Sequence, residues 1–380
     1  MASTSAILPG ATLGILGGGQ LGRMMAMAAR SLGYHILALD PDPSCAARFV
    51  VERCLAASFD DEFAAAVLAR ASQVVTIEIE QIALRSMEAA AHYAPVRPGP
   101  SVLRYVQDRA LQKRWLKDHG FPVGPYREAT TREELVAAVK ALGGDCYVKI
   151  ARGGYDGRGQ ARIHHPAEAN AAWDAIAGPC VVEQALPLEA ELSVLVARRP
   201  SGAMAVYPVA LNHHEHRILA WSVLPGPVSD RVATEAATLA RGIAEGLGVE
   251  GLLVVELFLL GDGRLLVNEL APRPHNSYHA SEIACATSQF EQAVRAVCDL
   301  PLGSVEVVRP AAIANLLGEL WLGAHPPSFD AALAIPGVRL HLYGKRVPRP
   351  GRKMGHLSAS GASPQEAVAK VKAALERLTT

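Results

Sequence analysis

The chain has 380 residues, half of them hydrophobic, which is long enough for two or three domains that each bury a core. Lys plus Arg number 37, as do Asp plus Glu, so no net charge favours nucleic acid or an acidic membrane surface over a small substrate. We therefore expect a globular protein that acts on small molecules, without nucleic-acid or membrane partners.

The six cysteines are scattered, and no two have two-residue spacing, so neither a disulfide framework nor a zinc knuckle is indicated. The first ten residues lack the basic and apolar segments of an export signal. The most apolar run, 252–260, is nine residues long and is interrupted by Glu256. These features predict a protein of the reducing cytoplasm with no membrane-spanning segment.

In the first part of the chain, short apolar runs typical of strands alternate with segments of helical periodicity. The predicted strands and helices are 11–17, 21–33, 34–40, 61–71 and 74–80. Their order is βαβαβ, which predicts a parallel sheet with covering helices. The proline-rich segment 97–101 predicts a domain boundary.

The rest of the chain mixes strands and helices around a glycine-dense segment. The predicted helices are 102–119, 132–142, 234–247 and 289–297, and the predicted strands are 146–150, 180–184, 191–199, 252–260 and 264–270. Segment 300–304 predicts a second boundary. Short strands near 338–343 and a helix at 364–378 would then form a small third unit.

Gly17, Gly19 and Gly22 follow a predicted strand and open a helix, with Asp40 at the end of the next strand. This G-x-G-x-x-G pattern is a dinucleotide fingerprint, because glycines permit a tight turn and the helix amides bind an anion. A nicotinamide-dependent oxidoreductase is therefore one hypothesis. The others are a turn that only packs, and a loop whose amides hold the phosphate of a smaller substrate.

Four glycines fall within 153–159, directly after Lys149 on a predicted strand. Such a density implies backbone that must move or approach a ligand closely, and the lysine could reach phosphate oxygens. The pattern differs from a P-loop. A structureless linker is the alternative, but linkers rarely interleave Tyr155, Asp156 and Arg158 with glycines.

Glu256 and Glu269 lie inside two apolar strand-like runs and would be expensive to bury without a partner. Between them, Asp262-Gly263 is a strong two-residue turn signal that puts the two glutamates directly opposite each other. Carboxylates at roughly 4.5–5.5 Å between Cβ atoms repel unless a cation such as Mg²⁺ lies between them. Alternatively, one glutamate pairs with an arginine and the other faces water, and a one-residue slip would separate them.

Segment 271–279 is rich in hydrogen-bond donors and has no apolar periodicity. His275 and His279 have the spacing of a helical zinc pair, but Pro272 and Pro274 argue against a helix, so a ligand-facing loop is predicted. The run 213–216 could be another metal site, although a solvated loop is the commoner outcome.

Motifs spread along the chain resemble one known family. The matching segments, in order, are GGGQLGRM, QDRALQKRWL, GGYDGRGQ, VEQ, NELAPRPHNS and PGRKMGH. Together they are similar to the biotin-independent ATP-grasp carboxylases of purine biosynthesis, the 5-(carboxyamino)imidazole ribonucleotide synthetases. The resemblance extends from about residue 12 to about residue 356.

The resemblance implies a chain of α/β and α+β class with an ATP-grasp fold. It implies a Rossmann-like N-terminal domain without NAD at 1–105, an ATP-grasp domain at 106–302 and a small C-terminal domain at 303–380. It also implies an ATP-dependent carbon–nitrogen ligase, in which ATP and bicarbonate form carboxyphosphate and the amine of 5-aminoimidazole ribonucleotide takes the carboxyl group. Mg²⁺ and a homodimer are expected on the same ground.

The resemblance implies an ATP site in which 183–186 would hold adenine, Glu191 the ribose, and Glu256 and Glu269 the Mg²⁺ ion. The full set is Arg109, Lys149, Gly154, Tyr155, Asp156, Gly157, Arg158, Gly159, Gln160, Glu183, Gln184, Ala185, Leu186, Glu191, His214, Asn268 and Glu269. Two positions depart from the family pattern. Ala271 stands where many ATP-grasp proteins have a metal-binding Asn, and Tyr278 where this family often has glycine.

The substrate-binding residues implied by the resemblance are Gln20, Leu21, Glu80, His275, Asn276, Arg352 and Lys353. The implied catalytic residues are Tyr155, Asp156, Arg273 and Lys353. Cations suit this site, because bicarbonate, carboxyphosphate and the substrate phosphate are all anions.

Three other classes compete with this interpretation. An oxidoreductase explains only the first glycine loop, and a non-catalytic nucleotide-binding module would lose the glutamate pair. The formate-using ATP-grasp transformylase that acts on glycinamide ribonucleotide would share the fold and the metal site. The wording of GGYDGRGQ and PGRKMGH favours the aminoimidazole substrate.

Overall fold

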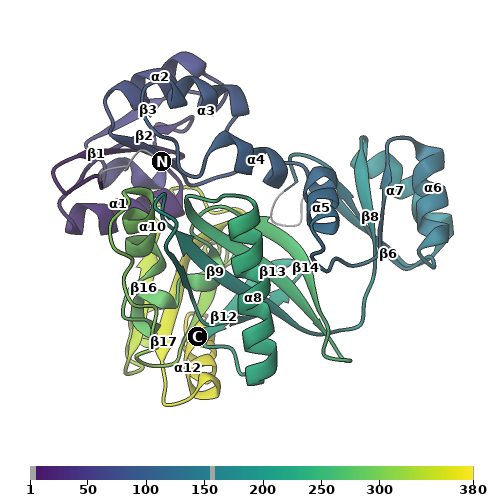
Figure 1. The fold of residues 1–380 in the computed structure, drawn as a ribbon. Coiled ribbons are helices and arrows are strands. Elements are labelled where there is room, and N and C mark those ends of the chain that lie inside the picture. Colours follow the sequence, from purple (N-terminus) through teal and green to yellow (C-terminus); the bar gives the residue numbers. More distant parts are fainter. Residues whose placement is uncertain (1–5, 155–158, 380) are drawn as a thin grey trace.

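The computed structural model describes residues 6–154 and 159–379. Figure 1 shows a helix-covered sheet near the N-terminus, a small sheet that projects to one side, and a large sheet that forms the body. Over the part of the chain that the structure describes, no helix combines the length and the apolar character needed to cross a bilayer.

The N-terminal part is a four-stranded parallel sheet in the order β3-β2-β1-β4. Its elements are β1 (Thr12–Leu16), α1 (Gln20–Ser31), β2 (His35–Asp40), η1 (Ala46–Phe49), β3 (Arg53–Ala56), α2 (Glu62–Arg70), β4 (Val74–Ile77) and α3 (Leu84–Ala91). The predicted βαβαβ order is confirmed, with β3 as an additional edge strand. Strand β3 escapes prediction because its four residues are partly exposed and show no alternation.

The projecting part is an antiparallel sheet in the order β5-β8-β6-β7. It follows α4 (Pro100–Val106) and α5 (Arg109–Asp118), and contains β5 (Tyr126–Ala129), α6 (Arg132–Ala141), β6 (Cys146–Ile150), β7 (Gln160–Ile163), η2 (Pro166–Glu168), α7 (Ala169–Ile176) and β8 (Cys180–Gln184). Val148 and Val182 pack with α6 and α7. Because strand side chains alternate, Lys149 and Glu183 point to the other face.

The body is a nine-stranded sheet in the order β14-β13-β9-β11-β12-β15-β17-β16, with β10 on β9. Its strands are β9 (Leu188–Arg198), β10 (Met204–Val206), β11 (Ala210–Glu215), β12 (Ile218–Leu224), β13 (Gly251–Leu260), β14 (Leu265–Ala271), β15 (Ala311–Leu317), β16 (Val338–Leu342) and β17 (Lys353–Ser360). Its helices are α8 (Asp230–Gly246), η3 (Asn276–Tyr278), α9 (Ser281–Ala284), α10 (Gln289–Val297), η4 (Gly318–Trp321), α11 (Phe329–Leu333) and α12 (Pro364–Glu376).

The helix predicted at 289–297 is confirmed as α10, whereas α8 begins at Asp230 rather than at 234. The reason is Ser229, whose hydroxyl accepts a hydrogen bond from the N–H of Val232 and so caps the helix earlier. The C-terminal strands join the body because β12 pairs with β15. Val223 of β12 packs in one core with Leu357 of β17, so the third part of the chain extends the central sheet.

One hydrophobic core fastens the N-terminal part to the body. Leu21 and Met25 of α1 pack there with Phe290 and Val294 of α10, and Figure 1 shows the two helices side by side. Arg97 adds a hydrogen bond between the two parts, because its guanidinium donates to the carbonyl oxygen of Val297 at 2.7 Å. The first glycine loop, which opens α1, is thereby held against the large sheet.

We predict that Phe290→Ala lowers the free energy of unfolding by about 3–5 kcal/mol, because it removes a ring that is 1% exposed from this core. Phe63→Ala is the matched control, since that ring is 74% exposed and should change stability by only about 0.5 kcal/mol. Urea denaturation followed by circular dichroism measures both. Equal losses in the two variants would show that the interface between α1 and α10 contributes little.

Candidate active site

The hairpin of β13 and β14 places Glu256 directly opposite Glu269, as predicted. The route to that register differs from the prediction. The two-residue turn is instead a three-residue loop, 261–263, in which Gly263 has a φ of 82°. The longer loop would offset the strands by one residue. A β-bulge at Asn268 restores the predicted pairing. Leu257 pairs with residue 267 and Glu256 pairs with residue 269, so Asn268 is the extra residue between them.

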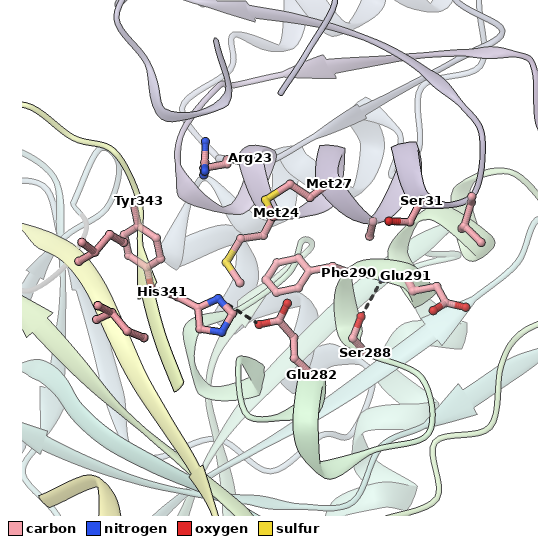
Figure 2. Close-up of a pocket in the computed structure, with 14 residues that line it drawn as sticks. Arg23, Met24, Met27, Ser31, Glu282, Ser288, Phe290, Glu291, His341 and Tyr343 are labelled. Atoms are coloured by element: carbon pink, nitrogen blue, oxygen red, sulfur yellow. Dashed lines mark hydrogen bonds and ion pairs between the residues drawn. The ribbon is translucent and has the colours of Figure 1, made fainter. Parts of the chain in front are cut away.

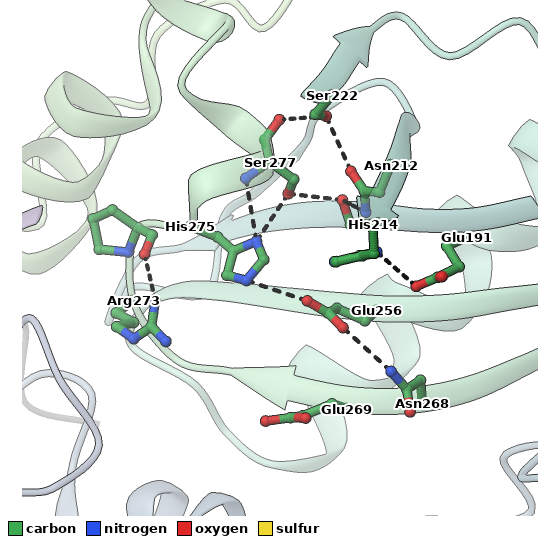
Figure 3. A network of polar contacts seen from close by, with 12 residues as sticks. Glu191, Asn212, His214, Ser222, Glu256, Asn268, Glu269, Arg273, His275 and Ser277 are labelled. Atoms are coloured by element: carbon green, nitrogen blue, oxygen red, sulfur yellow. Dashed lines mark hydrogen bonds and ion pairs between the residues drawn. The ribbon is translucent and has the colours of Figure 1, made fainter. Parts of the chain in front are cut away.

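The bulge brings two consecutive residues of β14 to one side of the hairpin, where a regular strand would present them to opposite faces. The Asn268 amide nitrogen donates to Glu256 Oε2 at 3.3 Å, and Asn268 Oδ1 accepts from Lys149 Nζ at 3.4 Å. Glu269 lies beside them with 47% of its side chain exposed (Figure 3). Three side chains with oxygen ligands therefore share this side.

The two glutamates differ in their affinity for a proton. Burial raises the pKa of Glu256, but the hydrogen bond and charge of His275, with the charge of His214, outweigh it and hold the pKa at about 2. Partial burial raises the pKa of Glu269; Arg109 opposes this rise and the negative charge of Glu256 adds to it. Glu256 is thus ionised, and a cation between the carboxylates would oppose the rise in the pKa of Glu269.

His275 fixes one side of Glu256, with its Nε2 at 3.2 Å from Glu256 Oε1 (Figure 3). Its Nδ1 lies 2.9 Å from Ser277 Oγ, and its backbone N–H donates to Gln289 Oε1 of α10. The segment forms only the short 3₁₀ turn η3, so the predicted loop is confirmed. A zinc pair of His275 and His279 would need an α-helix over 275–279, so the short turn η3 gives that alternative no support.

Asn276 has unused hydrogen-bonding capacity within this loop. Its side chain is 8% exposed, and within the described ranges neither its amide nitrogen nor its oxygen has a hydrogen-bond partner. Leaving a buried polar group unpaired costs about 1–3 kcal/mol. Asn276 is therefore suited to a polar ligand.

His214 of β11 pairs with Glu191 of β9, with 2.9 Å between Nδ1 and Oε2. Burial lowers the pKa of His214, but the bond to Glu191 and the negative charges of Glu191 and Glu256 raise it above its ordinary value. The neighbouring His213 ring instead stacks on Trp221. The run 213–216 therefore does not converge on one ion.

The projecting sheet supplies positive charge to the hairpin of β13 and β14. Glu183 receives Lys149 Nζ at 2.8 Å and Lys113 Nζ at 3.0 Å, and all three side chains are at most 13% exposed. Burial raises the pKa of Glu183, but the two ammonium groups lower it to about 2. Two cations and one anion give this cluster a net positive charge. Lys149 is the member of the cluster that also contacts Asn268.

Arg109, the first residue of α5, connects this sheet to the hairpin. Its guanidinium donates to the carbonyl oxygens of Ile150 at 3.2 Å and Gly154 at 3.3 Å, and lies 3.8 Å from Glu269 Oε2. Asp108 sets the start of the helix by accepting two backbone N–H groups at 3.0 Å.

The second glycine segment is described at its two ends. Gly159 has a φ of 68°, and Gln160 begins β7 opposite Lys149. The predicted residues Tyr155, Asp156, Gly157 and Arg158 lie outside the described residues.

The segment 183–186 crosses from the projecting sheet to the body. The N–H of Gln184 donates to the carbonyl oxygen of Pro125 at 3.0 Å, and that of Ala185 to the carbonyl oxygen of Asp145 at 2.9 Å. These two N–H groups are therefore paired within the protein.

Protein carboxylates already occupy the amides of the first glycine loop. Glu78 accepts the N–H groups of Gly19 and Gly22 at 3.0 Å each, and Asp40 accepts that of Gly18 at 2.7 Å. Burial raises the pKa of Glu78 to about 7 although these amides oppose it. A dinucleotide pyrophosphate would have to displace both carboxylates, which argues against the oxidoreductase.

The predicted substrate residues come from three parts of the chain. Glu80 Oε1 lies 2.8 Å from Arg273 Nε, which joins the N-terminal sheet to the donor-rich loop. Gln20 is half-buried at the start of α1, whereas the Leu21 side chain is buried in the core, which leaves only its backbone for a ligand. Placement in the fold therefore agrees better with a side-chain role for Gln20 than for Leu21.

Arg352 and Lys353 lie where β17 begins. The charge of Arg352 acts on Asp42, beside the first glycine loop, and the charge of Lys353 acts on His214 and on His279. The C-terminal cations therefore face the same region as the N-terminal loop and the hairpin.

Comparison with known proteins identifies the family. Three domain models match: the ribonucleotide synthetase preATP-grasp domain over 10–107, the ATP-grasp domain over 114–290, and the phosphoribosylaminoimidazole carboxylase C-terminal domain over 311–370. The N5-carboxyaminoimidazole ribonucleotide synthase of Brucella melitensis biotype 1 is 42% identical over 357 residues, 93% of this chain and 97% of the relative. This chain belongs to the N5-carboxyaminoimidazole ribonucleotide synthase family.

Solved synthases share the whole fold. The Staphylococcus aureus synthetase complexed with ADP has a TM-score of 0.92 and 32% identity, over 97% of this chain and 98% of that one. The Aspergillus clavatus synthase in complex with ADP and 5-aminoimidazole ribonucleotide has a TM-score of 0.86 and 30% identity, over 97% and 98%. The predicted ATP-grasp fold with its N- and C-terminal domains is confirmed.

Sequence reasoning missed two residues of this synthase site. Lys113 lies four residues after Arg109, a spacing that places both on one face of α5, so the signal was present. Glu78 lies in the same run as Glu80, and a carboxylate at the end of a buried strand signals a partner. Its partners are backbone amides, which the sequence does not reveal.

We predict that Glu183→Gln flattens the acid dependence of stability. The folded pKa of Glu183 is about 2, below the ordinary value of 4.5, so its carboxylate stabilises the fold above pH 4.5 and this contribution is lost as the pH falls. Between pH 5 and pH 3, the unaltered protein should lose about 2 kcal/mol more unfolding free energy than the variant.

Urea denaturation at each pH measures this difference, and Glu88→Gln on the exposed side of α3 is the matched control. The same acid dependence in Glu183→Gln as in the unaltered protein would rule out a charged Glu183 between the two lysines.

Proposed function

We propose that this chain carboxylates 5-aminoimidazole ribonucleotide to 5-(carboxyamino)imidazole ribonucleotide with ATP and bicarbonate, as an ATP-dependent carbon–nitrogen ligase of de novo purine biosynthesis. The observation that carries the proposal is the pair Glu256 and Glu269, which lies close to Lys149 and Arg109. Membership of the synthase family supports the choice of substrate.

Glu256, Glu269 and Asn268 present the oxygen ligands that Mg²⁺ takes, so the site fits this ion. When bound, Mg²⁺ would neutralise charge on the β- and γ-phosphates of ATP. Lys149 and Arg109 would add positive charge from the opposite side. The remaining ATP contacts are proposed for 183–186, Glu191 and His214.

In the first step, a bicarbonate oxygen attacks the γ-phosphorus, and the bond from that phosphorus to the β,γ-bridging oxygen breaks, which releases ADP and forms carboxyphosphate. In the second step, the exocyclic amine attacks the carboxyphosphate carbon. Its C–O bond to phosphate breaks, inorganic phosphate leaves and the nitrogen loses a proton. Each step develops negative charge on oxygen, which fixed cations stabilise.

We assign the acceptor side to the region between the first glycine loop and the start of β17. Arg273, oriented by Glu80, and Lys353 would stabilise the carboxyl and phosphate oxygens. Asn276 would use its unpaired amide on the ribonucleotide. The residues proposed to complete this site are Gln20, Leu21, His275 and Arg352, and Tyr155 and Asp156 stay predicted catalytic residues.

We propose three further properties on the ground of the resemblance. They are domain limits at 1–105, 106–302 and 303–380, a homodimer, and a cytoplasmic location, which the six free cysteines support. A formate-using transformylase remains the second candidate, because it would share the carboxylates and cations.

We expect phosphate release from ATP to require Mg²⁺, bicarbonate and 5-aminoimidazole ribonucleotide together, and NAD to be neither bound nor turned over. A coupled phosphate assay and calorimetry measure these properties. Stimulation of phosphate release by formate with glycinamide ribonucleotide would favour the transformylase. Tight NAD binding would contradict the proposed ligase activity.

In the same assay, Glu256→Gln and Glu269→Gln should each lower turnover by orders of magnitude, because each removes one charge facing Mg²⁺ at constant volume. The double variant should be strongly non-additive, since both carboxylates act on one ion. Near-normal turnover of either single variant at saturating Mg²⁺ would show that the pair does not hold the metal.

Lys353→Ala should weaken the apparent affinity for the ribonucleotide, or turnover, at least tenfold, because a hydrogen bond to a charged group contributes about 1.5–3 kcal/mol. The affinity for ATP should stay close to that of the unaltered protein. Lys140→Ala on the exposed side of α6 is the control. Steady-state kinetics with each substrate varied in turn decide the outcome, and unchanged ribonucleotide constants would remove Lys353 from the site.

A further inference from the structure

A second cluster of metal-ligating side chains lies close to the donor-rich loop 271–279. Glu282 of α9, His341 of β16 and His356 of β17 each place one potential ligand atom within 4.8 Å of the other two. The two histidines are direct cross-strand partners, with ring centroids 4.5 Å apart. Glu282 Oε2 lies 3.8 Å from His341 Nδ1, too far for a hydrogen bond.

Two atoms of this cluster are buried without a partner. His356 is fully buried, and its Nδ1 lies 2.8 Å from the Tyr343 hydroxyl. Across the residues described, neither its Nε2 nor Glu282 Oε2 has a hydrogen-bond partner. If Nδ1–H donates to Tyr343, Nε2 carries a lone pair, and such a bond fixes the tautomer in many metal sites.

The cluster can be reached from solvent. A cavity of about 480 Å³ is lined by Glu282, His341 and Tyr343, with Met24 and Phe290 on its other sides (Figure 2). His341 keeps 31% of its side chain exposed. An ion can therefore enter through the cavity, and water in the cavity can complete its coordination.

We propose that Glu282, His341 and His356 form a binding site for a divalent transition metal of the zinc type. Two imidazoles and one carboxylate are ligands that zinc takes in proteins, with bonds of about 2.0–2.2 Å. Tetrahedral coordination would draw the ligand atoms to about 3.3 Å from one another, which the partly exposed His341 can reach by rotation.

The charges around the cluster select against a hard cation. Arg339 acts electrostatically on both Glu282 and His341, and the cluster itself contributes one carboxylate. Mg²⁺ keeps its water shell and prefers oxygen ligands, so it gains little here. A metal that bonds to imidazole nitrogen gains enough to overcome the repulsion.

Metal binding would brace two segments that meet at the active site. Glu282 follows the loop that carries His275, and His356 lies three residues after Lys353 on the same strand. One ion bonded to both would hold the beginning of β17 against that loop.

The test is a Zn²⁺ titration of the chelator-stripped full-length protein in excess Mg²⁺, in competition with a chromophoric zinc chelator. We expect one saturable site in the unaltered protein, and at least tenfold weaker binding in both Glu282→Gln and His341→Gln. His164→Gln, a histidine with 71% of its side chain exposed, is the matched control and should bind as the unaltered protein does. Zn²⁺ should also raise the unfolding temperature only of the proteins that bind it.

His275→Gln separates this site from the catalytic hairpin, because His275 and Glu256 could themselves take zinc. Retained Zn²⁺ binding in His275→Gln supports the proposal. No saturable site, unchanged affinity in Glu282→Gln or His341→Gln, or loss confined to His275→Gln would each overturn it. Circular dichroism of every variant ensures that a loss of binding is not a loss of folding.

Discussion

The repulsion between Glu256 and Glu269 is the constraint on which the active site depends. Antiparallel pairing places both carboxylates on one side of a hairpin, where they cannot both stay ionised unless positive charge lies nearby. Around them the structure gathers His275, Lys149 and Arg109. A pair of carboxylates among these positive groups is suited to bind a cation.

The positive charges, in turn, are held together by a buried negative charge. Lys113 and Lys149 would repel each other, and the buried Glu183 between them makes their approach favourable. Because the two lysines share one anion, the cluster keeps a surplus of positive charge while each ion remains paired. An acidic hairpin is thus in contact with basic side chains of α5 and of the projecting sheet.

The first glycine loop shows why a short motif is weak evidence. Its spacing matches a dinucleotide site, yet Glu78 and Asp40 fill its amides from within the fold. Glycine is still required there, because a Cβ on Gly17 would lie 2.4 Å from the Glu78 side chain. The glycines of this loop let a protein carboxylate approach the backbone amides, whereas the motif suggested that a phosphate would bind them.

By itself, the sequence determined what depends on local periodicity and on residue order: the βαβαβ start, the helix at 289–297, the hairpin between the two glutamate-containing strands and the ATP-grasp family. Tertiary structure decided what depends on groups far apart in the chain. The bulge at Asn268, the pairing of Lys113 with Glu183 and the filling of the first loop by Glu78 all arise from contacts across strands and domains. Such contacts leave no periodic trace, because each joins single residues whose separation in sequence is arbitrary.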